Sequence, residues 1–196
     1  MTTPQEPQYA DRSYRSTAGI VGGLLLLGFA AWIGGDALLT GDGRVRLLAV
    51  AALLFVVPLI VAFTFRPVVY ANDDRMRVRN PFRTIDLPWA AVADVRAGYS
   101  SEVLTRDGTK YQLWSVPVSL RERKKAARRQ DPGVQSDDSQ AGKTAGADQT
   151  VADLRELAER CASRPTAQGG PHIRWAYEII APALAGLVLL VVLAVV

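Results

Sequence analysis

Residues that perform covalent or metal chemistry are scarce in this chain of 196 residues. His172 is its only histidine and Cys161 its only cysteine. A Ser-His-Asp triad needs a histidine beside its nucleophile, and a structural zinc site needs several Cys or His ligands. A single cysteine also excludes a disulfide scaffold. The composition therefore predicts no catalytic residue, no metal site and no cofactor.

The strongest local concentration of charge is a basic run at residues 121–129, in which Glu122 is the only acid. Each Lys or Arg near an anionic leaflet contributes about 1 kcal/mol. We therefore predict contact with anionic headgroups, with a solvated surface loop as the alternative. Nucleic acid is disfavoured because no aromatic side chains interleave to stack on bases. The predicted contact residues are Arg121, Arg123, Lys124, Lys125, Arg128 and Arg129.

Three apolar blocks, at residues 18–34, 47–65 and 179–196, contain no charged side chain. A membrane-spanning helix needs roughly 20 apolar residues. We expect a helical hairpin over 18–65, with helices at about 18–39 and 47–65, and a third spanning helix over 175–196. Because Arg12 and Arg15 precede the first block, a cleaved signal peptide is the alternative there.

The orientation follows from the basic residues that flank the predicted spans, because Lys and Arg accumulate on the cytoplasmic side. Nine arginines flank the spans on one side and two lie between the first two spans. The N-terminal tail, 1–17, and the whole middle are therefore expected in the cytoplasm, and the C-terminus at the outer face. The nine are Arg12, Arg15, Arg66, Arg75, Arg77, Arg79, Arg83, Arg164 and Arg174, and the two are Arg44 and Arg46.

Beyond Arg66 the apolar period changes from that of a helix to the two-residue period of strands. About six short antiparallel strands are expected before residue 114, and Asp107-Gly108 marks the last hairpin. A helix over 151–162, capped by Thr150, has one apolar stripe. The expected domain covers 66–163, with a basic and disordered insertion at 120–149, and a flexible tether follows at 164–174.

Three segments of the middle resemble a known family. They are Val68-Val69-Tyr70-Ala71-Asn72, Met76-Arg77-Val78-Arg79-Asn80-Pro81-Phe82-Arg83, and Ile85-Asp86-Leu87-Pro88-Trp89-Ala90-Ala91-Val92-Ala93-Asp94-Val95. The family is the bacterial membrane-anchored pleckstrin-homology-like (PH-like) domain group named after low molecular weight protein antigen 6. The resemblance implies a small antiparallel β-barrel or sandwich capped by a C-terminal helix, after two membrane helices. The third membrane helix and the insertion are departures from the family pattern.

The expected fold class is thus a membrane protein with three transmembrane α-helices and a cytoplasmic α+β PH-like domain. Eukaryotic relatives that bind inositol phosphates use basic side chains in the first strand-strand loop, whereas this chain has Asn72-Asp73-Asp74 there. Specific phosphoinositide binding at that loop is therefore not expected.

A non-enzymatic module that binds a protein partner or a lipid surface at the inner face is the expected function. The alternative is a membrane enzyme or assembly factor acting on a lipid or cell-wall precursor, for which Asp36 and Asp42 are the only carboxylates between the first two apolar blocks. Small residues four apart also allow a helix-mediated oligomer. These pairs are Gly19 and Gly23, Ala30 and Gly34, and Ala181 and Ala185.

Overall fold

The structure is a computed structural model that describes residues 12–97, 100–116 and 138–195. It divides into two compact units. Most of the strands and the helix that follows them lie in one unit. The three long apolar helices form the other, together with the turn at Arg79–Thr84 and the segment that leads into the last helix.

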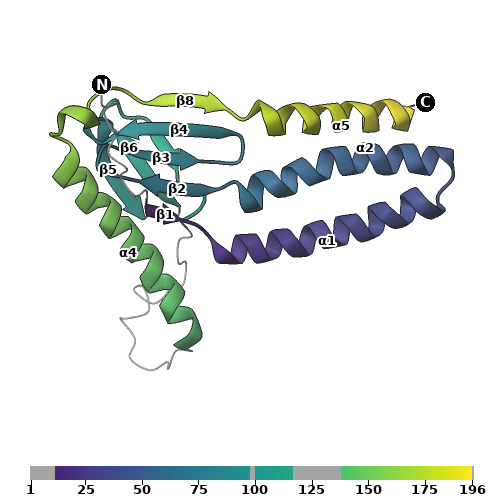
Figure 1. Cartoon of the computed structure of the whole chain (residues 1–196), viewed down its shortest axis with the longest axis horizontal. Helices are drawn as coiled ribbons and strands as arrows, with labels where there is room; N and C mark the ends of the chain where they lie inside the picture. The colour runs from purple at the N-terminus through teal and green to yellow at the C-terminus, as the bar shows by residue number, and fades with distance from the viewer. Residues whose placement is uncertain (1–11, 98–99, 117–137, 196) are drawn as a thin grey trace, which may run out of the picture. The chain divides into compact units, whose positions relative to one another are not determined.

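The helical unit contains α1 (Thr17–Thr40), α2 (Gly43–Ile60) with its π-helical continuation η1 (Val61–Phe65), and α5 (Tyr177–Val195) (Figure 1). At 1.5 Å per residue, α1 is about 36 Å long and α5 about 28 Å long. All three are long and apolar enough to cross a bilayer. Large apolar side chains stay exposed along them, for example Leu25 at 71% and Trp32 at 72%. The three predicted helices are confirmed, and each is a candidate membrane span.

Glycine allows the helices of this unit to approach one another closely. A Cβ on Gly186 of α5 would lie 2.4 Å from the backbone nitrogen of Phe55 on α2, and one on Gly34 of α1 would lie 2.7 Å from Cδ2 of Leu53. Gly34 is therefore used for close approach within the chain. Ala181 and Ala185 are exposed, and α5 instead buries Ile179, Ala183 and Gly186, which lie on a different stripe of the helix. A helix-mediated oligomer stays a prediction.

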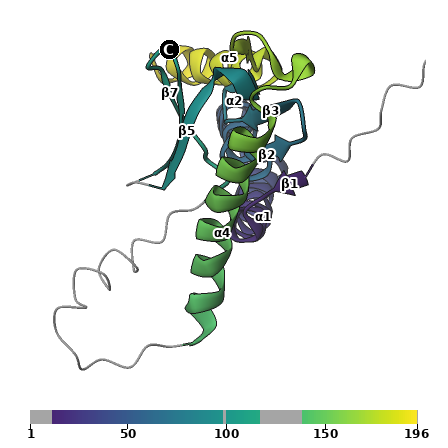
Figure 2. The same cartoon turned by 90° about the vertical axis from the view of Figure 1, so that its left-hand side faces the viewer.

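Two antiparallel sheets are built from the middle of the chain (Figures 1 and 2). The first has the order β1-β2-β3-β4-β8, with β2 at Val68–Ala71, β3 at Arg75–Arg79 and β4 at Arg83–Pro88. The second has the order β5-β6-β7, with β5 at Val92–Ala97, β6 at Ser101–Thr105 and β7 at Lys110–Gln112. These six strands are the six that the sequence predicts. Along β3 the buried Met76 and Val78 alternate with three arginines, so that one face of the strand meets the core.

The core of the strand unit is closed by α4 (Asp138–Cys161). The buried side chains of its C-terminal half are Val151, Leu154, Leu157 and Cys161, and they join one cluster with the fully buried Trp89. A helix with a single apolar stripe thus covers the sheets, as the resemblance implies (Figure 2). The expected capping helix and the PH-like fold are confirmed.

The connecting segments and the start of α4 differ from the sequence-based predictions at four points. Part of the tail pairs with β2 as β1 (Arg12–Tyr14), with Tyr14 opposite Val69, because the backbone of β2 would otherwise form an open edge. The tether contains the short helix η3 (Pro165–Ala167), where Ala167 is buried, and β8 (His172–Trp175), which takes the other edge of the same sheet.

Thr150 lies inside α4 and does not cap it, because this helix begins at Asp138. Residues 138–149, expected within the disordered insertion, are therefore helical. No proline interrupts residues 138–150, so the helix continues N-terminally from the buried stripe.

Candidate functional site

The six predicted headgroup contacts, Arg121, Arg123, Lys124, Lys125, Arg128 and Arg129, lie outside the described residues. Their membrane contact stays a prediction. The described residues offer three other places where polar side chains gather: the turn between β2 and β3, a groove beside β5, and one end of the helical unit.

The β2–β3 turn is organised by Asn72. Its Oδ1 accepts hydrogen bonds from the backbone nitrogens of Asp74 at 3.0 Å and Arg75 at 2.9 Å, which is an Asx-type turn. The backbone carbonyl of Asn72 accepts the indole Nε1–H of Trp89 at 2.7 Å, and the Trp89 backbone N–H donates to Asp74 O at 3.3 Å. Trp89 therefore anchors the turn while its ring fills the core, which gives this residue a structural role.

The two aspartates of this turn bind the chain that follows α4. Arg164 Nη1 lies 2.6 Å from Asp73 Oδ2, and Thr166 Oγ1 donates to Asp74 Oδ1 at 2.5 Å. The hydrogen bond to Asp73 raises the pKa of Arg164 above its ordinary value. The loop that carries cations in phosphoinositide-binding relatives thus carries acids here, and these acids contact the protein's own η3 segment.

A groove of about 300 Å³ lies between β5 and α4. Arg155 of α4 donates to Val95 O at 2.6 Å and to Asp94 Oδ1 at 3.2 Å, and Arg96 donates to Asp94 Oδ2 at 2.8 Å. The hydrogen bond from Arg96, and next the charge of Arg155, hold the pKa of Asp94 below its ordinary value. Arg155 also satisfies part of the open edge of β5. Sequence reasoning missed this groove because nothing in the spacing of Asp94 and Arg155 signals their contact.

At one end of the helical unit, Arg66 follows η1 and is nearly buried. Its side chain is 10% exposed, donates from Nε to Asn80 O at 3.1 Å and from Nη2 to Thr84 Oγ1 at 3.4 Å, and lies 2.7 Å from Glu178 Oε1. Arg66 therefore joins the end of α2 to the β3–β4 turn and to the first turn of α5.

Further arginines surround this contact, and together with Arg66 we call them the arginine collar: Arg66, Arg79, Arg83 and Arg174. Arg79 and Arg83 flank the β3–β4 turn, to which the side chain of Arg66 donates a hydrogen bond. Within this turn, Asn80 N donates to Arg83 O at 2.8 Å. Ala176 N donates to Phe82 O at 2.9 Å, which brings the segment after Arg174 to the same turn. Phe63 and Phe82 pack edge to face there, with ring centroids 5.4 Å apart. Glu178 is the acid within this group.

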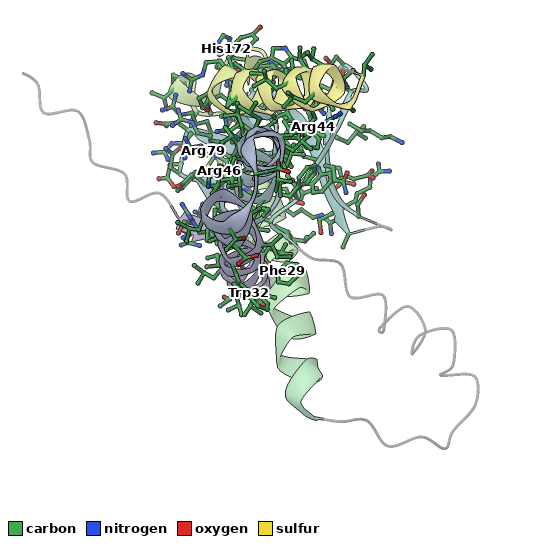
Figure 3. All side chains as sticks on the ribbon, turned by 90° about the vertical axis from the view of Figure 1, so that its right-hand side faces the viewer. Phe29, Trp32, Arg44, Arg46, Arg79 and His172 are labelled. Carbon is green, nitrogen blue, oxygen red and sulfur yellow. The ribbon has the colours of Figure 1, made fainter. Side chains whose placement is uncertain are left out.

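The opposite end of the helical unit has balanced charge, with Asp36, Asp42, Arg44 and Arg46. Asp42 Oδ1 accepts from Val45 N at 2.9 Å and so caps α2, and Arg44 Nη2 donates to Leu193 O at 3.2 Å near the end of α5. Figure 3 looks along the unit from this end, with Arg44 and Arg46 labelled. Asp42, a candidate for the enzyme alternative, therefore has a structural role.

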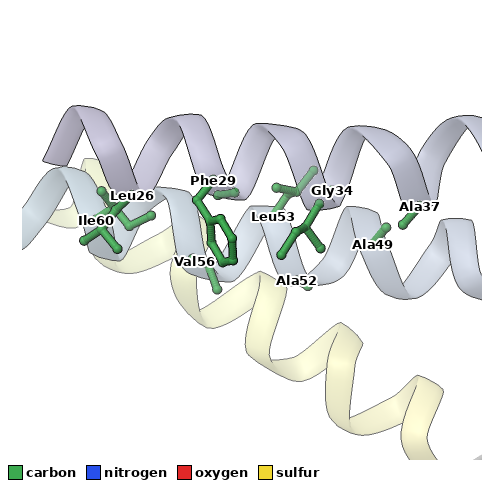
Figure 4. A pocket seen from close by; sticks show the side chains of 11 residues that line it. Leu26, Phe29, Gly34, Ala37, Ala49, Ala52, Leu53, Val56 and Ile60 are labelled. Atoms are coloured by element: carbon green, nitrogen blue, oxygen red, sulfur yellow. The ribbon is translucent and has the colours of Figure 1, made fainter. Parts of the chain in front are cut away.

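Between α1 and α2 lies an apolar groove of about 340 Å³. Figure 4 shows Leu26 near Ile60, Phe29 near Val56, and Leu53 beside Gly34. Every side chain that lines it is apolar, so it has no group for acid–base or nucleophilic chemistry. Within the described ranges, no group of three or more His, Cys, Asp or Glu residues is placed to hold a metal ion.

Of three comparisons with known proteins, one gives a match, and it agrees with this architecture. No curated protein and no solved structure matches the chain. Residues 66–138, which begin at the collar residue Arg66 and run through all six central strands to the first residue of α4, match one family. The two sheets, the capping helix and this match together show that residues 66–138 of the chain belong to the bacterial PH domain family.

Proposed function

We propose that this chain is a non-enzymatic integral membrane protein that presents its PH domain at the cytoplasmic face, where the domain binds a protein partner or a lipid surface. The observation that carries the orientation is the unequal charge at the two ends of the helical unit. The collar end has four arginines and Glu178, whereas the opposite end has two arginines and two aspartates.

The collar end is also where the chain passes between helices and domain. β1 ends just before α1, β2 follows Arg66 and Pro67, and β8 leads into α5. Since arginine is enriched on the cytoplasmic side of membrane spans, the collar end is assigned to the cytoplasm. The PH domain then lies inside the cell and the end of α5 lies at the outer face.

A non-enzymatic role is supported by the contacts that the polar groups of the domain make within the fold. The aspartates of the β2–β3 turn bind Arg164 and Thr166, and Asp94 binds Arg96 and Arg155. Catalysis needs groups that converge on a reacting atom with shifted pKa values. The ionisable pairs described here instead connect segments of the fold.

The proposal is tested by two reporter fusions to the full chain. A fluorescent reporter that folds only in the cytoplasm, fused after Arg129, should be bright, and an alkaline phosphatase that is active only outside, fused after Gly41, should be active. The reverse pattern would refute the orientation. Binding is then tested by capture of the intact protein in mild detergent, followed by protein and lipid analysis of the eluate. Catalytic turnover of a lipid precursor by the purified protein would refute the non-enzymatic role.

A further inference from the structure

We propose that the arginine collar is a binding site for the phosphate headgroups of anionic phospholipids, with Arg79 and Arg174 as the contacting cations. This inference rests on the proposed orientation, because it places the collar in the cytoplasmic leaflet. It concerns the helical unit and is separate from the basic run at 121–129.

Two of the four cations of the collar, Arg79 and Arg174, are available for a ligand. Arg66 is nearly buried and makes three contacts within the protein. Arg79 and Arg174 are exposed, and neither forms an ion pair with any other residue in the described ranges. An exposed arginine offers several N–H donors in a planar fork that suits the oxygens of a phosphate group.

The one carboxylate at the site does not cancel this charge. Glu178 is 64% exposed, lies 2.7 Å from Arg66 Nη1, and is also within electrostatic range of Arg79. Four arginines against one glutamate leave a local excess of positive charge. Glu178 holds Arg66 in place, which fixes the β3–β4 turn and with it the position of Arg79.

Aromatic side chains place the collar at headgroup depth. Trp175 is 55% exposed and Tyr177 is 68% exposed, on either side of the point where β8 passes into α5. Amphipathic rings of this kind prefer the boundary between headgroups and acyl chains. Arg174 immediately precedes them, so its guanidinium is positioned beside the phosphates of the leaflet rather than in bulk water.

The experiment uses the full-length protein with Trp32→Phe and Trp114→Phe, reconstituted in phosphatidylcholine bilayers. Of the two tryptophans that remain, Trp89 is fully buried and Trp175 is exposed. Quenching of tryptophan fluorescence by brominated phosphatidylglycerol is compared with quenching by brominated phosphatidylcholine, because Trp175 then reports on lipids at the collar. We expect a preference for phosphatidylglycerol. Each arginine should contribute about a fivefold preference, so Arg79→Gln and Arg174→Gln should each reduce it about fivefold and the double variant should bring it close to parity.

The matched control is Arg44→Gln with Arg46→Gln, which removes the same charge from the opposite end and should keep the preference. The double variant Arg79→Lys with Arg174→Lys keeps the charge and should retain most of the preference for phosphatidylglycerol. It tests the inference even if the glutamine variants fold poorly. Equal quenching by both lipids in the parent protein, or an undiminished preference in a folded double glutamine variant, would overturn the inference. Reporter fusions that still place the domain inside would then leave the proposed function standing, whereas reversed fusions would refute that function whatever the lipid preference.

Discussion

The contact of α5 with α2 depends on Gly186 having no side chain. A Cβ at this position would lie 2.4 Å from Phe55 N, and 2.8 Å from both Leu54 C and Phe55 Cα. All three atoms are backbone, so no side-chain rotation relieves the clash and α5 must move away from α2. We therefore expect Gly186→Val to destabilise the helical unit by about 3 kcal/mol, at the upper end of the usual cost of overpacking.

Matched glycines separate this clash from the general effect of a bulkier residue. Gly28 of α1 has no heavy atom within 4 Å of the position of its Cβ, so Gly28→Val should leave stability nearly unchanged. The three atoms nearest to a Cβ at Gly34 belong to the side chain of Leu53, which is able to rotate, so Gly34→Ala should give an intermediate loss. This order of stability losses follows from the atoms that the new side chain would contact, because a side chain can rotate away more easily than a backbone can move.

The assay is thermal unfolding of the purified full-length protein in a mild detergent. For a chain of this size, a loss of about 3 kcal/mol corresponds to a fall in melting temperature of about 6–12 °C. A Gly186→Val protein that melts with the parent protein would show that α5 does not lie backbone to backbone on α2. Equal losses in Gly28→Val and Gly186→Val would assign the effect to helix propensity instead.

Three further predictions use the same melting assay. Leu154→Ala should cost about 2–5 kcal/mol because Leu154 is fully buried against the sheets, whereas Glu156→Ala on the exposed face of α4 should cost little; equal effects would show that α4 does not cap the domain. Arg66→Met should cost about 2–3 kcal/mol because Asn80 O and Thr84 Oγ1 lose a charged donor. Glu178→Gln should cost less than about 1 kcal/mol because Glu178 is largely exposed. A larger loss for Glu178→Gln than for Arg66→Met would contradict the conclusion that Arg66 joins the end of α2 to the β3–β4 turn. The pKa of Asp94 is lowered in the folded state, so its stabilising contribution is full above its ordinary pKa of 3.8 and is lost as the pH falls through the lower folded value. Arg96→Gln should flatten this part of the stability profile below pH 4, by a small amount because the pair faces solvent; an unchanged profile would show that Arg96 does not hold the carboxylate.

The local sequence pattern was sufficient to predict secondary structure wherever a segment has one clear apolar period or composition. The three membrane helices follow from uncharged apolar runs, because backbone polar groups in lipid must bond within their own helix. The six central strands follow from the two-residue alternation around residues such as Met76 and Val78, and the stripe of Leu154 and Leu157 identifies the helix that covers them. In each case the environment that a side chain needs is encoded by its immediate neighbours.

The sequence by itself thus determined the class of the protein: three candidate membrane helices and a small β-rich domain with a capping helix. Only the tertiary structure decided how the polar residues are used. Asp73 binds Arg164, Asp94 binds Arg155, and Arg66 binds Glu178, each across a long separation in the chain. Such pairs leave no periodic signal, because the contact depends on where two elements meet and not on either element alone. The same reason explains β1 and β8: three or four residues are too few to show a pattern, and they became strands because β2 and β4 offered them open edges.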